Sequence, residues 1–127
     1  MVIRNFEYLL CVGKSVLNNT CNHIQKLFFS KEMCLYEYIL DGKTDKGLEV
    51  IIDDTVLVCM FNNDNCNKSI LYFDKLDDLM DYTRYCDNNF EYDKQRKIWI
   101  LPNNYLSLFF PDENTSRFGF IQTLKES

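Results

Sequence analysis

The chain has 127 residues, a formal net charge of −5 and a hydrophobic content of 46%. This hydrophobic content excludes a disordered protein, and no apolar run approaches the roughly 20 residues that would span a bilayer. A pI of about 4.8 argues against direct nucleic-acid binding, because most of that affinity comes from cationic contacts to phosphates.

Length and cysteine usage predict one domain in a reducing compartment. A chain of this size forms a single compact domain, residues 1–127, whose core is large enough to need no disulfides. The six cysteines are expected to be free thiols, because Arg4 and Glu7 interrupt the apolar start and no secretory signal is recognisable. We therefore expect a cytoplasmic protein with no membrane segment and no cofactor.

The first third of the chain is expected to be helical. Residues 3–17 carry apolar side chains at the three- and four-residue spacing of a buried helix face. These residues are Phe6, Leu9, Leu10, Gly13, Val16 and Leu17. Thr20 is expected to cap a second helix over residues 20–33, although this segment could equally lead straight into a strand.

Residues 34–73 have the composition of β-structure. Strands are expected at 34–40, ending at Asp41-Gly42, and at 47–52, 55–61 and 69–73, because these runs are rich in β-branched and aromatic residues. The asparagine-rich stretch 61–69 predicts a turn, since asparagine and aspartate tolerate left-handed backbone conformations.

Residues 73–86, FDKLDDLMDYTRYC, predict an acidic amphipathic helix over about 74–87. At about 100° per residue, one narrow arc of this helix is acidic and the opposite arc is apolar. The acidic arc consists of Asp74, Asp77, Asp78, Asp81 and Tyr85, and the arc expected to be buried consists of Leu76, Leu79, Met80, Thr83 and Cys86. Asp74 is the expected N-cap. Residues 74–93 hold seven acids and two bases and so account for the whole net charge.

The last third of the chain predicts further strands. Residues 87–96 are expected to be irregular or a hairpin, and strands are expected at 97–101, 105–110 and 117–124. A polar turn is expected at 112–116. Because short connections favour antiparallel pairing, we predict an α+β fold. In it, an antiparallel sheet of about five or six strands is packed by the N-terminal helix or helices and the acidic helix, and whether the strands form one sheet or two stays open.

Few side chains suggest catalysis or metal binding. Cys21 and His23 are two positions apart, which on a helix points them in different directions rather than into a nucleophile–base pair. Cys59 and Cys66 flank a turn, but a structural zinc site needs four ligands in closely spaced pairs. We therefore expect neither a catalytic residue nor a metal ligand.

The acidic helix face is the candidate site, and it predicts a protein-binding surface. Its residues are Asp74, Asp77, Asp78, Asp81, Tyr85, Asp87 and Glu91, with Tyr85 as an anchor at the end of the row. A row of carboxylates on a rigid helix complements a basic groove, and basic grooves usually bind nucleic acid. We therefore expect a non-catalytic inhibitor that mimics nucleic acid and covers the basic surface of a nuclease or nucleoprotein complex. Such a protein would be a phage anti-defence (anti-CRISPR) protein or a bacterial toxin-immunity protein.

Other interpretations remain open. The acidic face could simply keep the protein soluble. The chain could be an accessory subunit that buries an apolar sheet face against a partner, or a small enzyme whose site includes Cys21, His23 and the Asp53-Asp54 turn. The oligomeric state is not predicted.

Overall fold

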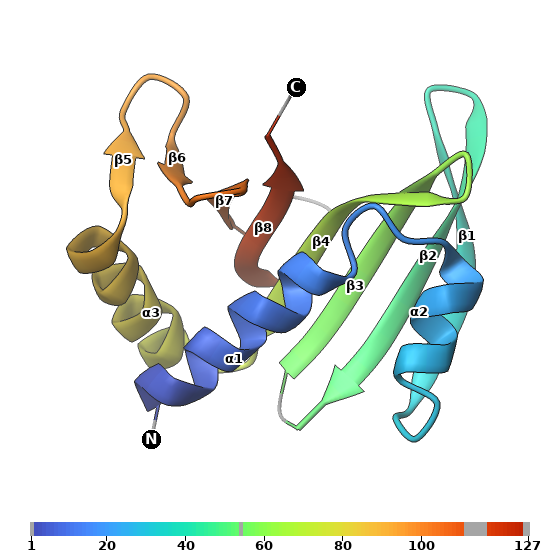
Figure 1. The fold of residues 1–127 in the computed structure, drawn as a ribbon, viewed down its shortest axis with the longest axis horizontal. Coiled ribbons are helices and arrows are strands. Elements are labelled where there is room, and N and C mark those ends of the chain that lie inside the picture. Colours follow the sequence, from blue (N-terminus) through green and yellow to red (C-terminus); the bar gives the residue numbers. More distant parts are fainter. Residues whose placement is uncertain (1, 54, 111–116, 126–127) are drawn as a thin grey trace.

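The computed structural model describes residues 2–53, 55–110 and 117–125 (Figure 1). These residues form three helices and one eight-stranded antiparallel sheet, so the α+β class is confirmed and the sheet is larger than expected. The helices are α1 (Val2–Ser15), α2 (Cys21–Leu27) and α3 (Leu76–Asn89). The strands are β1 (Met33–Leu40), β2 (Lys43–Ile52), β3 (Thr55–Asn62), β4 (Asn65–Phe73), β5 (Glu91–Asp93), β6 (Ile98–Ile100), β7 (Asn104–Phe109) and β8 (Phe118–Leu124). The turn expected at 112–116 lies outside the described residues.

The sheet joins two consecutive runs of antiparallel strands. Its strand order is β1-β2-β3-β4-β8-β7-β6-β5, and every neighbouring pair is antiparallel. The two runs meet where β8 pairs with β4, with Tyr72 opposite Gly119. Residues 33–73 and 91–124 therefore contribute to one sheet rather than two, and α3 connects the two runs.

Two-residue turns close the first and third hairpins. Asp41 and Gly42 both have positive φ, 52° and 78°, as a two-residue type I′ turn between β1 and β2 requires. Asn63 and Asp64 have φ of 53° and 61° and form the turn between β3 and β4. The expected turn over 61–69 is therefore too long, because cross-strand pairing draws the flanking asparagines into the strands.

The second helix is shorter than expected. The Thr20 side chain accepts a hydrogen bond from the backbone N–H of His23 at 3.2 Å, which confirms Thr20 as the N-cap. The helix ends at Leu27, well before residue 33, because Met33 already pairs with Val50 across the β1–β2 ladder. Within the described residues, no helix is long and apolar enough to cross a membrane.

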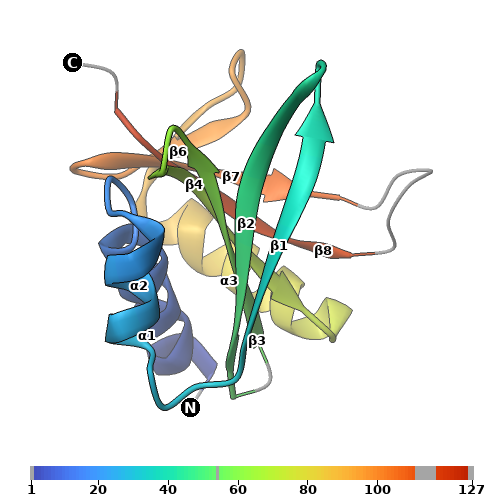
Figure 2. The ribbon, with the colours of Figure 1, turned by 90° about the vertical axis from the view of Figure 1, so that its right-hand side faces the viewer.

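The core lies between the helices and one face of the sheet (Figures 1 and 2). Phe6 of α1 is fully buried, and its ring stacks on Tyr82 of α3 with 4.2 Å between the ring centroids. The same ring contacts Phe120 of β8 at 5.2 Å. These aromatic contacts fix α1 between α3 and the sheet.

Helix α1 approaches the sheet closely at Gly13. The Ser69 hydroxyl of β4 donates a hydrogen bond to the Gly13 carbonyl at 2.7 Å. Beside it, the Gln122 amide of β8 donates to the Leu10 carbonyl at 3.3 Å and accepts from the Asn104 amide at 2.8 Å. Because Ser69, Asn104 and Gln122 are buried, these bonds satisfy polar groups that water does not reach.

Candidate functional site

Helix α3, which carries most of the predicted site, begins later than expected. Its first residue is Leu76, and Lys75, not Asp74, occupies the N-cap position without a side-chain cap. The expectation of an Asp74 cap is therefore wrong, because β4 continues to Phe73 and the chain needs two residues to turn. Asp77 and Asp78 lie in the first helical turn, where the helix dipole favours negative charge.

The buried side of α3 differs from the expected one. The buried residues are Leu79, Tyr82 and Cys86, whereas the side chains of Leu76 and Met80 are 59% and 51% exposed. The helix is rotated by roughly 70° from the expected orientation, given about 100° per residue. Tyr82 explains the rotation, because its ring stacks on Phe6 and contributes more buried area than the exposed Leu76 and Met80.

Four of the predicted acids gather around the N-terminal half of α3. Asp74 and Asp77 are exposed, and Asp78 and Asp81 are half-buried. Asp81 pairs with Arg84 at 3.4 Å on the helix surface. Among the described residues, Asp74, Asp77 and Asp78 join no ion pair within 4.0 Å. No described side chain therefore forms an ion pair with these three carboxylates.

The side chain of Tyr85, the predicted anchor, is half-buried. Its hydroxyl donates a hydrogen bond to Glu7 at 2.9 Å, and its ring contacts Phe6 at 5.7 Å and Phe90 at 6.0 Å. Burial and the hydrogen bond to Glu7 raise the pKa of Tyr85 to about 12. Tyr85 thus ties α3 to α1 and does not project as a free anchor.

The last two predicted residues lie apart from this acidic group. Asp87 accepts a hydrogen bond from the Trp99 indole N–H at 3.0 Å, which connects α3 to β6. Glu91 is exposed on β5, beyond the end of the helix. The structure therefore brings together Asp74, Asp77, Asp78 and Asp81, and separates Asp87 and Glu91 from them.

An apolar groove of about 360 Å³ runs along α3 beside these acids. It is lined by Leu76, Leu79, Met80, Thr83, Arg84, Asp87, Leu108 and Phe110. Phe110, which follows β7, is 61% exposed. The sequence pattern missed this groove because it assigned Leu76 and Met80 to the core, and no local signal places residues 108–110 next to α3. Asp77 and Asp81 each lie about 100° around the helix from Leu76 and Met80, and the charged residues that line the groove itself are Arg84 and Asp87.

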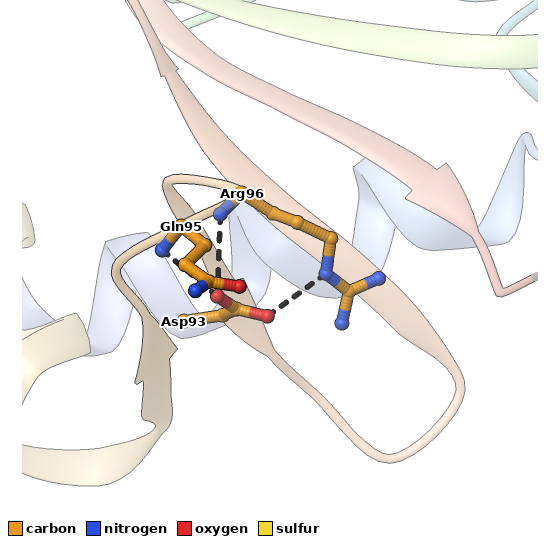
Figure 3. Close-up of polar contacts among 3 residues, drawn as sticks. All are labelled: Asp93, Gln95 and Arg96. Carbon is orange, nitrogen blue, oxygen red and sulfur yellow. Dashed lines mark hydrogen bonds and ion pairs between the residues drawn. The ribbon is translucent and has the colours of Figure 1, made fainter.

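The tightest basic cluster in the sequence, Lys94, Arg96 and Lys97, lies in the turn between β5 and β6. The Asp93 carboxylate accepts hydrogen bonds from the backbone N–H groups of Gln95 and Arg96 at 3.0 and 3.2 Å, and from Arg96 Nε at 2.8 Å (Figure 3). These hydrogen bonds lower the pKa of Asp93, and the bond from the Arg96 side chain has the largest effect. The Arg96 guanidinium also lies 5.0 Å from the centre of the Tyr105 ring, so it shapes the turn rather than extending a basic patch.

The cysteines form no nucleophile–base pair with the histidine. Cys21 is buried and its thiol donates to Gln25 Oε1 at 3.9 Å, whereas His23 is exposed. The hydrogen bond to Cys66 and burial raise the pKa of the Cys59 thiol. Within the described ranges, no group of three or more histidine, cysteine, aspartate or glutamate side chains is placed to hold a metal ion. Asp53 lies exposed in a turn with a φ of 53°, and Asp54 lies outside the described residues.

Comparison of the chain with protein-family models, with curated proteins and with solved structures finds no match. The surface chemistry of α3 and its neighbours therefore carries the functional inference.

Proposed function

We propose that the protein is a non-catalytic inhibitor that binds a partner protein through the N-terminal half of α3. The observation that carries this proposal is the combination, on one helix, of an exposed apolar groove and three carboxylates at its start that join no ion pair with the described side chains. Protein interfaces use buried apolar contacts for affinity and charge complementarity for orientation and association rate. The groove and the acids supply these two elements on one helix.

The charge of this surface favours a basic partner. Asp77, Asp78 and Asp81 lie within the first two turns of the helix, and Asp74 lies just before it. A basic groove that binds nucleic acid presents cations to phosphates, and carboxylates placed there would compete with those phosphates. We therefore propose a cytoplasmic nuclease-type protein or nucleoprotein complex as the partner, and a phage anti-defence or toxin-immunity role for this chain.

The experiment compares two variants that remove the same number of charges. The site variant carries Asp74→Asn, Asp77→Asn, Asp78→Asn and Asp81→Asn. The control variant carries Glu32→Gln, Glu37→Gln, Asp45→Asn and Asp53→Asn, all on the β1–β2 side of the sheet. A partner captured from the host is purified, and its affinity for each variant is measured at two salt concentrations, with and without nucleic acid.

The proposal predicts a loss of affinity that is specific to the site variant. At about 0.2–1 kcal/mol per exposed ion pair, four substitutions should weaken binding by roughly 1–4 kcal/mol. Wild-type affinity should fall as salt rises, and the wild-type protein should displace nucleic acid from the partner. Equal binding of both variants, unaffected by salt, would instead support the accessory-subunit interpretation.

A second variant tests the groove separately. Leu76→Ala and Met80→Ala change exposed side chains, so the fold should keep its thermal stability. The double variant should weaken the complex equally at low and moderate salt, because it removes apolar contact and leaves the charge unchanged. Full affinity of this variant would exclude the groove from the interface.

A further inference from the structure

Strand β1 presents a long unpaired edge. It contains eight residues and lies at one end of the sheet, whereas β5 at the other end contains three (Figure 1). Exposed edges of this length are templates for pairing with another strand, and proteins usually protect them with proline or lysine. The sequence of β1, MCLYEYIL, contains neither and has a single charge, Glu37.

The backbone groups that face outward can be assigned from the β1–β2 register. Ile51 N–H donates to the Glu32 carbonyl at 2.9 Å, so this pair is hydrogen-bonded. Hydrogen-bonded pairs alternate along an antiparallel ladder, which makes residues 34, 36 and 38 the next ones bonded to β2. The N–H and C=O groups of residues 33, 35, 37 and 39 therefore point away from β2, toward the open edge.

Apolar side chains accompany this open edge. Leu35 is 52% exposed and Ile39 is 75% exposed. In the segment that leads into β1, Leu27 and Phe29 are 52% and 82% exposed. A strand with free backbone groups and exposed apolar side chains would bury both on pairing.

We propose that two copies of the chain pair through their β1 strands, antiparallel and about a two-fold axis at Tyr36. This register uses the outward backbone groups of residues 33, 35, 37 and 39. It places Leu35 opposite Glu37 of the second copy, and Lys31 opposite Asp41 of the second copy. An axis shifted to Glu37 would place the two Glu37 carboxylates opposite each other, which is unfavourable. The opposite charges that this register brings together flank the strand, Lys31 before β1 and Asp41 after it, so the two ends of β1 are complementary in charge to those of a second copy, which is the proposed occupant.

This dimer is independent of the proposed inhibitor function. Helix α3 and β1 lie at opposite sides of the molecule in Figure 1, so pairing at β1 leaves the α3 groove accessible. A dimer would present two such grooves, one from each copy.

The first test is a register-specific cross-link. In the proposed register, position 38 faces Cys34 of the second copy at a non-hydrogen-bonded site, where Cα atoms are about 4.5 Å apart and a disulfide can form. Within one chain, positions 34 and 38 are about 13 Å apart along the strand, so no internal bond competes. Tyr38→Cys, in a Cys11→Ser background that removes another exposed thiol, should give a covalent dimer on mild oxidation. The control Ile39→Cys, whose side chain lies on the other face of the sheet, should remain non-covalent.

The second test removes one outward backbone donor. Glu37→Pro deletes an N–H group that bonds nothing in β2, whereas Glu37→Ala keeps it. Sedimentation of the wild type and of Glu37→Ala should show a monomer–dimer equilibrium, and Glu37→Pro should be monomeric with an unchanged circular dichroism spectrum. A wild type that is monomeric at all concentrations, a dimer unaffected by Glu37→Pro, or equal cross-linking at positions 38 and 39 would each overturn the proposal.

Discussion

Replacing Gly13 by alanine should destabilise the protein, although alanine is the better helix former. Gly13 lies in α1 where the helix contacts the sheet. A Cβ atom at this position would overlap the Gln122 side-chain nitrogen and lie 3.3 Å from the Ser69 hydroxyl. Since both neighbours are buried, neither can swing into solvent to make room.

The size of the effect follows from opposing contributions. Helix propensity favours alanine by about 1 kcal/mol. Overpacking costs about 1–3 kcal/mol. Displacing Gln122 would also break its bonds to the Leu10 carbonyl and the Asn104 amide, and each buried polar group left unpaired costs about 1–3 kcal/mol. With one of these polar groups left unpaired, we expect Gly13→Ala to lower the free energy of unfolding by about 1–5 kcal/mol.

Urea denaturation followed by circular dichroism measures this change, with Lys14→Ala as a control at an exposed neighbouring position of α1. Repeating the substitution in a Gln122→Ala background tests whether overlap with Gln122 causes the loss of stability. If overlap with Gln122 is responsible, Gly13→Ala should cost less in that background, with a coupling of about 0.5–3 kcal/mol. A Gly13→Ala protein that is more stable than wild type, with no coupling to Gln122, would refute this account of the α1–sheet contact.

Two further predictions concern the cap of α2 and alkaline unfolding. Thr20→Ala should lower the free energy of unfolding by about 1 kcal/mol, measured by thermal denaturation, because the His23 N–H loses its acceptor. Burial raises the pKa of Cys86 and of Tyr85 to about 12, so both groups keep their protons in the folded chain and lose them earlier in the unfolded chain. Stability should therefore be full below pH 9 and fall as the pH rises through 12, and Tyr85→Phe should make that fall shallower. A stability independent of pH in this range would contradict the assigned burial of both groups.

Local chemistry was sufficient to predict the elements that depend on near neighbours. The Asp41-Gly42 turn, the Thr20 cap and the position of the strand before Asp41 were read from residues within a few positions of each other. Such features follow from backbone preferences and short-range hydrogen bonds, which the sequence displays directly. The strand expected at 97–101 is confirmed as β6, whereas β5 lies in the segment expected to be irregular or a hairpin, because pairing with β6 rather than propensity stabilises it.

The candidate site was predicted in part, for the same reason. The acids from Asp74 to Asp81 are near neighbours in sequence and remain together. Tyr85 and Asp87 have partners that no helical periodicity reveals, since Glu7 is 78 positions from Tyr85 and Trp99 is 12 positions from Asp87. Tyr82 also has a long-range partner, Phe6. Stacking of these two rings turns Leu76 and Met80 toward solvent and creates the groove. Long-range aromatic packing, not local hydropathy, therefore decides which face of α3 is exposed.

Gly119 explains why the strands form one sheet rather than two. In a sequence, glycine within a strand reads as a weak point. In the structure, a Cβ atom there would overlap the Leu71 carbonyl oxygen, so the absence of a side chain lets β8 approach β4 closely enough to pair. This pairing makes the two runs of strands continuous and sets β1 and α3 at opposite sides of the molecule. The same junction thus leaves room for the proposed second copy at β1 and the proposed partner at α3 to be bound at once.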